Sequence, residues 1–249
     1  MWGRHGRLPL TTAARSQGRL NVSIITDGAD VTGSTYFENP RSEMLPFVPT
    51  DVATVLDIGC GAGGFAGQLK NRNGDVEVWG IELDAAVAAR AGETVDRVLV
   101  GDALEVVAGL PAAQFDCVVM NDVLEHLQDP AALLRALRPA LKPGAVLVAS
   151  IPNVRYFFNV ADLAVHGRWD YTDEGILDRT HLRFFTRSSM VSLFEEAGFI
   201  VDRVVGINPT GSAKFKLVNL LTLGRWSDMQ YLQFACRARL TNKSEKEEA

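Results

Sequence analysis

The feature of this chain that most constrains its fold is the alternation, from residue 52 onward, of short apolar runs with helical patterns. The runs are rich in β-branched residues, and the segments between them carry apolar side chains at helical spacing. This alternation is typical of βαβ units, which form a mostly parallel sheet with helices on both faces. The sequence therefore predicts an α/β protein with a doubly wound sheet whose last strand is antiparallel. The seven expected strands are Val52–Ile58, Val76–Ile81, Arg97–Val100, Phe115–Met120, Ala145–Ile151, Phe199–Val205 and Met229–Arg237.

Residues at the expected helix ends support this pattern. Asp129 followed by Pro130 is typical of a helix N-terminus, because aspartate caps free N–H groups and proline fits the first turn. The Lys-Pro-Gly turn at 142–144 is expected to stop that helix. Thr186 is expected to cap a later helix that ends at Gly198.

The chain length predicts a single domain over residues 31–240, since two large α/β domains would need a longer chain. Two stretches, 155–185 and 206–228, interrupt the alternation after strand ends, where open α/β sheets bind ligands. We expect them to form a lid insertion and to select the substrate. Residues 1–30 have an arginine-rich, transit-peptide-like bias and are expected to be a disordered extension, and 241–249 a disordered tail.

The composition argues against several classes of protein. The net charge of -5 and the pI near 5.4 give no cationic field that would attract nucleic acid. No apolar run approaches the roughly 20 residues of a transmembrane segment. The cysteines Cys60, Cys117 and Cys236 are widely separated and odd in number, which predicts free thiols in a reducing, cytoplasmic compartment.

A glycine turn follows the first expected strand, and glycines let a ligand approach the main chain closely. Gly59, Gly61 and Gly64 satisfy the dinucleotide fingerprint. Glu82 lies at about the distance downstream that a ribose-binding acid would have. Asp57, two residues before the first glycine, separates the alternatives, because a carboxylate repels a diphosphate and attracts the ammonium group of a methionine moiety.

The run from Asp57 to Gly63 resembles the first motif of the class I S-adenosylmethionine-dependent methyltransferases, and the resemblance extends over roughly residues 36–199. Further motifs follow in the family's order, with Glu82 after the second strand, Asp102 after the third and 121–126 after the fourth. The resemblance implies a Rossmann-like fold, S-adenosyl-L-methionine as cofactor and S-adenosyl-L-homocysteine as product.

The resemblance also implies roles for individual residues. Glu82 would accept hydrogen bonds from both ribose hydroxyls, and Asp102 would accept one from the adenine amino group. Tyr36 and Arg41 would meet the cofactor's carboxylate, the arginine by a bidentate pair. The expected cofactor-binding residues are Tyr36, Arg41, Asp57, Gly59, Cys60, Gly61, Gly63, Phe65, Glu82, Leu83, Asp102, Ala103, Asn121, Asp122 and Leu124.

The acceptor is expected to be a hydroxyl of a small molecule. The chain lacks the Asn/Asp-Pro-Pro-aromatic signature of nucleobase N-methyltransferases at Asn121 to Leu124. The run Asp178 to Phe185 resembles a subgroup of glycan and secondary-metabolite enzymes, which favours a sugar or glycoside, such as a polysaccharide or glycolipid precursor. The candidate substrate-binding residues are Tyr156, Trp169, Tyr171 and Arg179.

His181 is the first candidate for the base that removes the acceptor's proton, because the ordinary pKa of histidine lies near neutrality. Its alternative role is to hydrogen-bond the backbone and anchor the lid. His126 and Asp122 are the other candidate bases. A Mg²⁺ site is a weaker alternative and no metal ligand is assigned, because the hard oxygen ligands match no compact metal loop. These acids are Asp122, Asp170, Asp173 and Asp178.

Several alternatives stay open from the sequence. The acceptor could be another metabolite, such as a quinone or a phenol, methylated on nitrogen or oxygen. From other classes, a NAD-dependent dehydrogenase or a non-catalytic cofactor-binding module would also use a glycine loop. The segment 213–223 could touch a membrane peripherally or form a homodimer contact instead of packing in a monomer.

Overall fold

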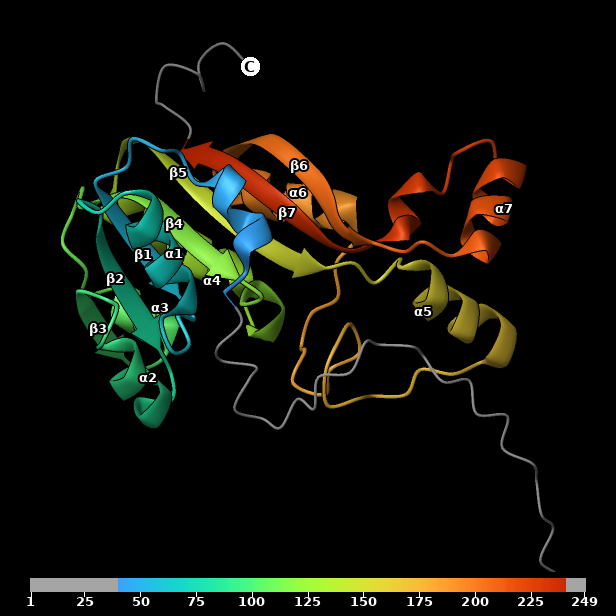
Figure 1. Ribbon diagram of the computed structural model, residues 1–249, viewed down its shortest axis with the longest axis horizontal. Helices are drawn as coiled ribbons and strands as arrows, with labels where there is room; N and C mark the ends of the chain where they lie inside the picture. The colour runs from blue at the N-terminus through green and yellow to red at the C-terminus, as the bar shows by residue number, and fades with distance from the viewer. Residues whose placement is uncertain (1–39, 241–249) are drawn as a thin grey trace, which may run out of the picture. The chain divides into compact units, whose positions relative to one another are not determined.

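The computed structural model describes residues 40–240, which contain one seven-stranded sheet with the order β3-β2-β1-β4-β5-β7-β6 (Figure 1). Only β7 runs antiparallel to its two neighbours, β5 and β6. The predicted Rossmann-like, mostly parallel sheet with an antiparallel last strand is therefore confirmed. The strands are β1 Thr54–Ile58, β2 Glu77–Glu82, β3 Arg97–Val100, β4 Phe115–Asn121, β5 Leu141–Pro152, β6 Phe199–Pro209 and β7 Tyr231–Leu240.

Helices cover both faces of the sheet, as predicted. On one face, Phe65 and Leu69 pack in a core with Val55 and Val119 of the sheet. On the other face, Phe194 packs in the larger core. The first face carries η2 Ser42–Phe47, α1 Gly64–Arg72 and α2 Ala85–Ala91, and the second carries α3 Ala103–Val107, α4 Pro130–Leu137 and α6 Arg187–Glu196.

The predicted helix caps are present, but one predicted helix end is wrong. Asp129 accepts a hydrogen bond from the N–H of Ala132 at 2.9 Å, and Thr186 caps α6 within a capping box. The helix α4 ends at Leu137 rather than at the turn 142–144. The reason is Pro139, which has no N–H to continue the helix and lies in the 3₁₀ turn η4 Arg138–Ala140. Lys142, Pro143 and Gly144 instead lie in β5.

The two insertions have different structures. Residues 155–185 begin with α5 Phe157–Ala161 and the π-helical turn η5 Asp162–His166, and continue without regular helix to Phe185. The stretch 206–228 is shorter than predicted, because its first residues extend β6 by pairing with β7. The remainder holds α7 Ala213–Leu221, with η6 Ser227–Gln230 before β7. The ring centres of Phe157 and Phe215 lie 5.5 Å apart and join α5 to α7. Figure 1 shows these two helices at the same end of the sheet.

Some expectations fall outside the described residues: the extension 1–30, the tail 241–249 and the cofactor contact of Tyr36. The cysteines are free and buried, as predicted. Within residues 40–240, no helix combines the length and the apolar character needed to cross a membrane.

Gly80 in β2 makes the close packing of the glycine turn possible. A Cβ atom at this position would lie 2.5 Å from Sγ of Cys60, so a side chain there collides with the turn. The backbone holds the same contact, since the N–H groups of Gly59 and Cys60 donate to the carbonyl of Ile81 at 2.8 and 3.2 Å. The turn is therefore fixed against the second strand.

Gly80→Ala is expected to lower the free energy of unfolding by about 1–3 kcal/mol, because the added methyl overpacks the contact with Cys60. Adding Cys60→Ala should recover part of the loss, since it removes the colliding sulfur. Urea denaturation of the single and double variants measures both effects. Gly74→Ala is the control, because nothing lies within 4 Å of a Cβ there. Wild-type stability of Gly80→Ala would show that this packing is unimportant.

Candidate active site

The candidate site lies at the carboxyl ends of β1, β2 and β4, which are neighbours in the parallel part of the sheet. Ligands of open α/β sheets bind in this position, because the loops that leave the strands diverge there. The glycine turn leaves β1, Glu82 ends β2, and Asn121 ends β4. The fold thus brings together residues that are far apart in the sequence.

The glycine turn has a backbone that other residues rarely adopt. Gly59 has φ +70° and Gly63 has φ +84°, both in the left-handed region. A Cβ atom on Gly59 would also lie 2.7 Å from a methyl of Val123, in the loop after β4. The turn therefore passes close to that loop.

Glu82 is buried and connects the two strand ends. One carboxylate oxygen accepts from the N–H of Gly61 and the other from the N–H of Asp84, both at 3.0 Å. Asp84 in turn caps α2 with its own side chain. Because each carboxylate oxygen can accept two hydrogen bonds, Glu82 keeps capacity for a pair of ligand hydroxyls. Its position fits the predicted contact with a ribose.

Asp57 is buried at the end of β1, where it is 2% exposed. Its Oδ2 atom has no hydrogen-bond partner among residues 40–240. Burial, and then the negative charge of Glu82, raise the pKa of Asp57 to about 7. A buried carboxylate without a full set of partners is costly unless a ligand completes it, so this position favours a cationic ligand group.

Apolar side chains stand exposed beyond the ends of β2 and β3. Leu83 is 72% exposed, Val100 54% and Leu104 41%. Asp102 lies among them and caps α3, which begins at Ala103, through a 2.9 Å bond from the N–H of Leu104. This surface suits a flat apolar ring with a polar edge.

Two predicted cofactor residues with large apolar side chains lie in the core instead, as does Cys60, which is 6% exposed. Phe65 is 3% exposed and Leu124 is 0% exposed, and each belongs to a hydrophobic cluster. The side chain of Phe65 therefore packs in the core on one face of the sheet, and that of Leu124 packs in the core on the other face. Any contact with a cofactor at these two positions would come from the main chain.

Arg41 pairs with Asp122 and Glu43, and the distance from its Nε to the Glu43 carboxylate is 3.0 Å. The other Asp122 oxygen accepts from Ser150 Oγ at 3.0 Å and from the Gln233 amide at 2.8 Å. Burial raises the pKa of Asp122, although Arg41 opposes the shift. Asp122 thus has a full set of partners, which makes it a poor candidate base in this arrangement.

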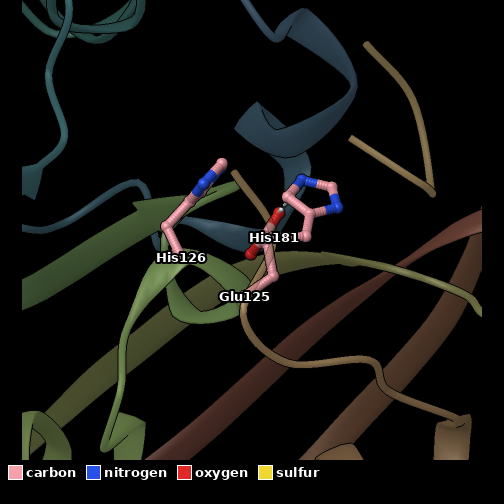
Figure 2. Close-up of side chains that lie close together, drawn as sticks. All are labelled: Glu125, His126 and His181. Atoms are coloured by element: carbon pink, nitrogen blue, oxygen red, sulfur yellow. Dashed lines mark ion pairs between the residues drawn. The ribbon is translucent and has the colours of Figure 1, made fainter. Parts of the chain in front are cut away.

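Glu125, His126 and His181 form a compact cluster beside these residues (Figure 2). Glu125 and His126 belong to the 3₁₀ turn η3 Leu124–His126 after β4, and His181 comes from the insertion. Nε2 of His181 lies 4.0 Å from Oε1 of Glu125, and the two imidazole rings are 4.7 Å apart in an edge-to-face arrangement. The structure therefore brings together two of the three candidate bases.

A family described as a methyltransferase domain matches residues 34–204. The chain belongs to this methyltransferase family.

Two curated relatives extend the comparison. The chain is 30% identical over 164 residues to a ubiquinone biosynthesis O-methyltransferase of Psychrobacter arcticus, covering 62% of each chain. It is 35% identical over 112 residues to a trans-aconitate 2-methyltransferase of an Azoarcus species, covering 45% of this chain and 44% of the relative. The chain therefore matches less than two thirds of the length of these relatives.

A solved structure agrees in fold. A SAM-dependent methyltransferase from Archaeoglobus fulgidus superposes with a TM-score of 0.58 at 20% identity, over 79% of this chain and 90% of that one. At this identity the likeness shows the fold, and it agrees with the Rossmann-like sheet of this methyltransferase chain.

The insertion is fastened to the backbone of Glu125. The N–H groups of Leu182 and Arg183 both donate to the Glu125 carbonyl, at 2.8 and 3.0 Å. Nδ1 of His181 lies 2.9 Å from the carbonyl of Ile176, within the insertion. His181 thus has the predicted backbone bond, while its other nitrogen faces the carboxylate of Glu125.

The surroundings of Glu125 and His126 favour the neutral forms of these two side chains. Burial, and then the negative charge of Asp122, raise the pKa of Glu125 well above its ordinary value. Burial, and then the neighbouring His181, lower the pKa of His126. Glu125 is therefore negatively charged less readily, and His126 positively charged less readily, than the same side chains in water.

The four predicted substrate residues are dispersed over the insertion. Trp169 packs on Phe184 with ring centres 5.3 Å apart, and Tyr156 packs on Phe158 at 5.7 Å. Tyr171 is 50% exposed, and Arg179 forms a surface ion pair with Asp173 at 2.8 Å. A hollow of about 290 Å³ in this region is lined by other residues, namely Asn159, Asp162, Arg168, Asp170, Thr172, Ile176, Leu177 and Leu232.

The four aspartates considered as metal ligands from the sequence, Asp122, Asp170, Asp173 and Asp178, do not form a metal-binding group in the described residues. Among residues 40–240, the one group of side chains with a metal-binding arrangement is Glu125, His126 and His181, which contains none of the four aspartates. Glu125 was not recognised as a site residue from the sequence. The sequence offered one signal for it: Glu125 is followed by His126, and the pair comes shortly after the apolar run that forms β4.

Asp57→Asn is expected to stabilise the cofactor-free protein at pH 8 by on the order of 3 kcal/mol. The folded-state pKa of about 7 exceeds the ordinary value of 3.8, so between these pH values the folded state holds a proton that the unfolded state has released. Wild-type stability should therefore fall as the pH rises from about 4 to about 7. The variant lacks this fall. Urea denaturation across this range, and at pH 8, measures it.

Asp75→Asn serves as the control for this comparison, because Asp75 is an exposed loop residue. Its stability should follow that of the wild type at every pH. If Asp57→Asn showed the same pH dependence as the wild type, Asp57 would not carry the raised pKa.

Proposed function

We propose that this chain is an S-adenosylmethionine-dependent methyltransferase that acts on a hydroxyl of a small molecule. The observation that carries the proposal is the buried carboxylate of Asp57, which lies at the start of the glycine turn with one oxygen unpartnered among residues 40–240. An ammonium group completes such a carboxylate, whereas a diphosphate would be repelled by it. The methyltransferase family of the chain supports the same choice.

The described residues fit this cofactor along the strand ends. Glu82 would receive the ribose hydroxyls, and Asp57 would face the amino group of the methionine moiety. The adenine would lie on the exposed apolar surface formed by Leu83, Val100 and Leu104. When bound, the cofactor supplies a methyl group that is already activated on a sulfonium.

For the acceptor, we favour a phenolic hydroxyl, as in a quinone precursor, over a sugar hydroxyl. The sugar prediction rested on the motif in the insertion, and neither curated relative described above is named for a sugar substrate. The relative named for ubiquinone biosynthesis supports an oxygen acceptor on a quinone-related ring. The relative named for trans-aconitate supports a carboxylate as the second candidate.

A hydroxyl acceptor must lose its proton as it attacks the methyl carbon. Glu125 and His126 lie in the loop after β4, and His181 lies beside them in the insertion. The resemblance of residues 121–126 to the family's motif implies that this loop lines the methyl-transfer site. In the metal-free arrangement described here, a nitrogen lone pair of His181 or His126 is available to take the proton. Asp122, paired with Arg41, would hold the β4 loop in position.

Cofactor choice can be measured directly by calorimetry on the purified chain. We expect S-adenosylmethionine to bind and NAD not to bind. Asp57→Asn should weaken S-adenosylmethionine binding by about 10-fold to 100-fold, the equivalent of one lost charge-assisted hydrogen bond. Asp75→Asn should bind like the wild type. Binding of NAD in place of S-adenosylmethionine would overturn the proposal, and wild-type affinity of Asp57→Asn would remove Asp57 from the site.

The acceptor class can be measured with methyl-labelled cofactor and three groups of compounds: phenols and catechols, glycosides, and polycarboxylic acids. We expect label to be transferred to phenolic oxygen. Transfer to glycosides alone would restore the sugar prediction, and transfer to carboxylates alone would favour the second candidate. A protein that binds the cofactor but methylates no acceptor in any group would be a binding module, in contradiction to the proposal.

A further inference from the structure

The carboxylate of Glu125 is the least satisfied group in the described structure. Glu125 is 1% exposed, and neither of its oxygens has a hydrogen-bond partner among residues 40–240. Burying a carboxylate without partners costs several kcal/mol even when it is protonated, so native proteins rarely do it without a reason. The two imidazoles beside it suggest what completes the site.

His181 presents a free lone pair to this carboxylate. Its Nδ1 lies 2.9 Å from the carbonyl of Ile176, and a carbonyl can only accept. Nδ1 therefore carries the proton in the neutral ring, and Nε2 has a lone pair. That nitrogen is the one that lies 4.0 Å from Oε1 of Glu125.

His126 is held in the same tautomer. Its Nδ1 lies 3.3 Å from the carbonyl of Thr180 and 3.1 Å from the hydroxyl of that residue. The hydroxyl donates its own proton to Asp178 at 2.6 Å, so it too accepts from the imidazole. Nδ1 of His126 is therefore the donor, and Nε2 is again left with a lone pair.

This pattern is characteristic of metal ligands. Histidines that bind metals donate their other ring N–H to a backbone carbonyl or a carboxylate, which fixes the ring and its tautomer. Here both histidines do so, and one ligand atom from each of the three side chains lies within 4.8 Å of the others. In Figure 2 the Glu125 carboxylate lies between the two histidine side chains.

We propose that Glu125, His126 and His181 bind a divalent first-row transition-metal ion, such as Zn²⁺ or Mn²⁺. Two imidazoles and one carboxylate suit these ions, whereas Mg²⁺ prefers oxygen ligands and keeps its waters. Three protein ligands leave coordination positions open, as in catalytic rather than structural sites. The site forms only when the insertion closes on the β4 loop, because His181 belongs to the insertion.

An open position on the ion gives it a role in the reaction, a step that rests on the function proposed above. With the acceptor's hydroxyl oxygen at that position, the cation would lower the pKa of the hydroxyl, which would then release its proton to solvent. An oxygen electron pair then forms the bond to the methyl carbon, the carbon–sulfur bond breaks, and its pair remains on sulfur. With the ion bound, the two imidazoles serve as ligands and not as bases.

Metal binding can be tested without cofactor or acceptor, on full-length protein first dialysed against a chelator. Calorimetry with Zn²⁺ and with Mn²⁺ should give one site per chain, and Mg²⁺ should bind at least about 100-fold more weakly. Glu125→Gln, His126→Asn and His181→Asn should each weaken Zn²⁺ binding by about 100-fold or more. His166→Asn is the matched control, because His166 is exposed and outside the cluster. It should bind Zn²⁺ like the wild type.

A second measurement does not require the cluster variants to fold. Proton NMR of the wild-type protein with substoichiometric Mn²⁺ should broaden the imidazole signals of His126 and His181 and leave that of His166 sharp. Absence of a stoichiometric Zn²⁺ or Mn²⁺ site in the wild type would overturn the proposal. So would unchanged affinity in folded cluster variants, or broadening of all histidine signals alike.

The role in the reaction has its own readout, with the phenolic acceptor and labelled cofactor. Metal-stripped protein should lose methyl transfer and regain it when Zn²⁺ or Mn²⁺ is added back. If the stripped protein transferred methyl as fast as the loaded protein, the step through the ion would be wrong, while the proposed function and the metal binding would both stand. If the loaded protein bound the ion but transferred no methyl, the proposed function and the ion's role in the reaction would both fail, while metal binding would stand.

Discussion

The functional arrangement depends on one constraint, the parallel alignment of β1, β2 and β4, which brings their carboxyl ends to one edge of the sheet. Each of these ends carries a buried acid: Asp57, Glu82 and, one turn beyond β4, Glu125. Burying three carboxylates along one edge of the sheet opposes folding, and the surrounding core must offset that cost. Glu82 is satisfied by backbone N–H groups, whereas Asp57 and Glu125 each keep oxygens without partners in the described part of the chain. Each of these two carboxylates can bind a cationic group: an ammonium group at Asp57 and a metal ion at Glu125 in the proposals above.

The insertion forms direct hydrogen bonds with this edge of the sheet. Two backbone N–H groups, from Leu182 and Arg183, are bonded to the carbonyl of Glu125, so the position of that glutamate and the closure of the insertion depend on each other. Thr180, the residue next to His181, holds His126 by its carbonyl and hydroxyl. Substrate selection by the insertion and the chemistry at the cluster would thus be linked through a few short contacts.

Much of the fold follows from local sequence signals, whereas the detail of the site does not. Strand periodicity and caps such as Asp129 and Thr186 predict elements, because these signals act within a few residues. Pro139 ended α4 earlier than the more obvious turn at 142–144. The pairing of Arg41 with Asp122 joins residues 81 apart in sequence, so no local pattern could reveal it. Burial of Glu125 likewise depends on where the insertion folds back, which is a tertiary property.

The most direct test of the account is a crystal structure of the protein with S-adenosylhomocysteine, the product left after methyl transfer. We expect the ribose hydroxyls to bond to Glu82, the amino group to lie at Asp57, and the sulfur to face the cluster of Glu125, His126 and His181. A ligand bound elsewhere, or one whose sulfur points away from that cluster, would contradict the account.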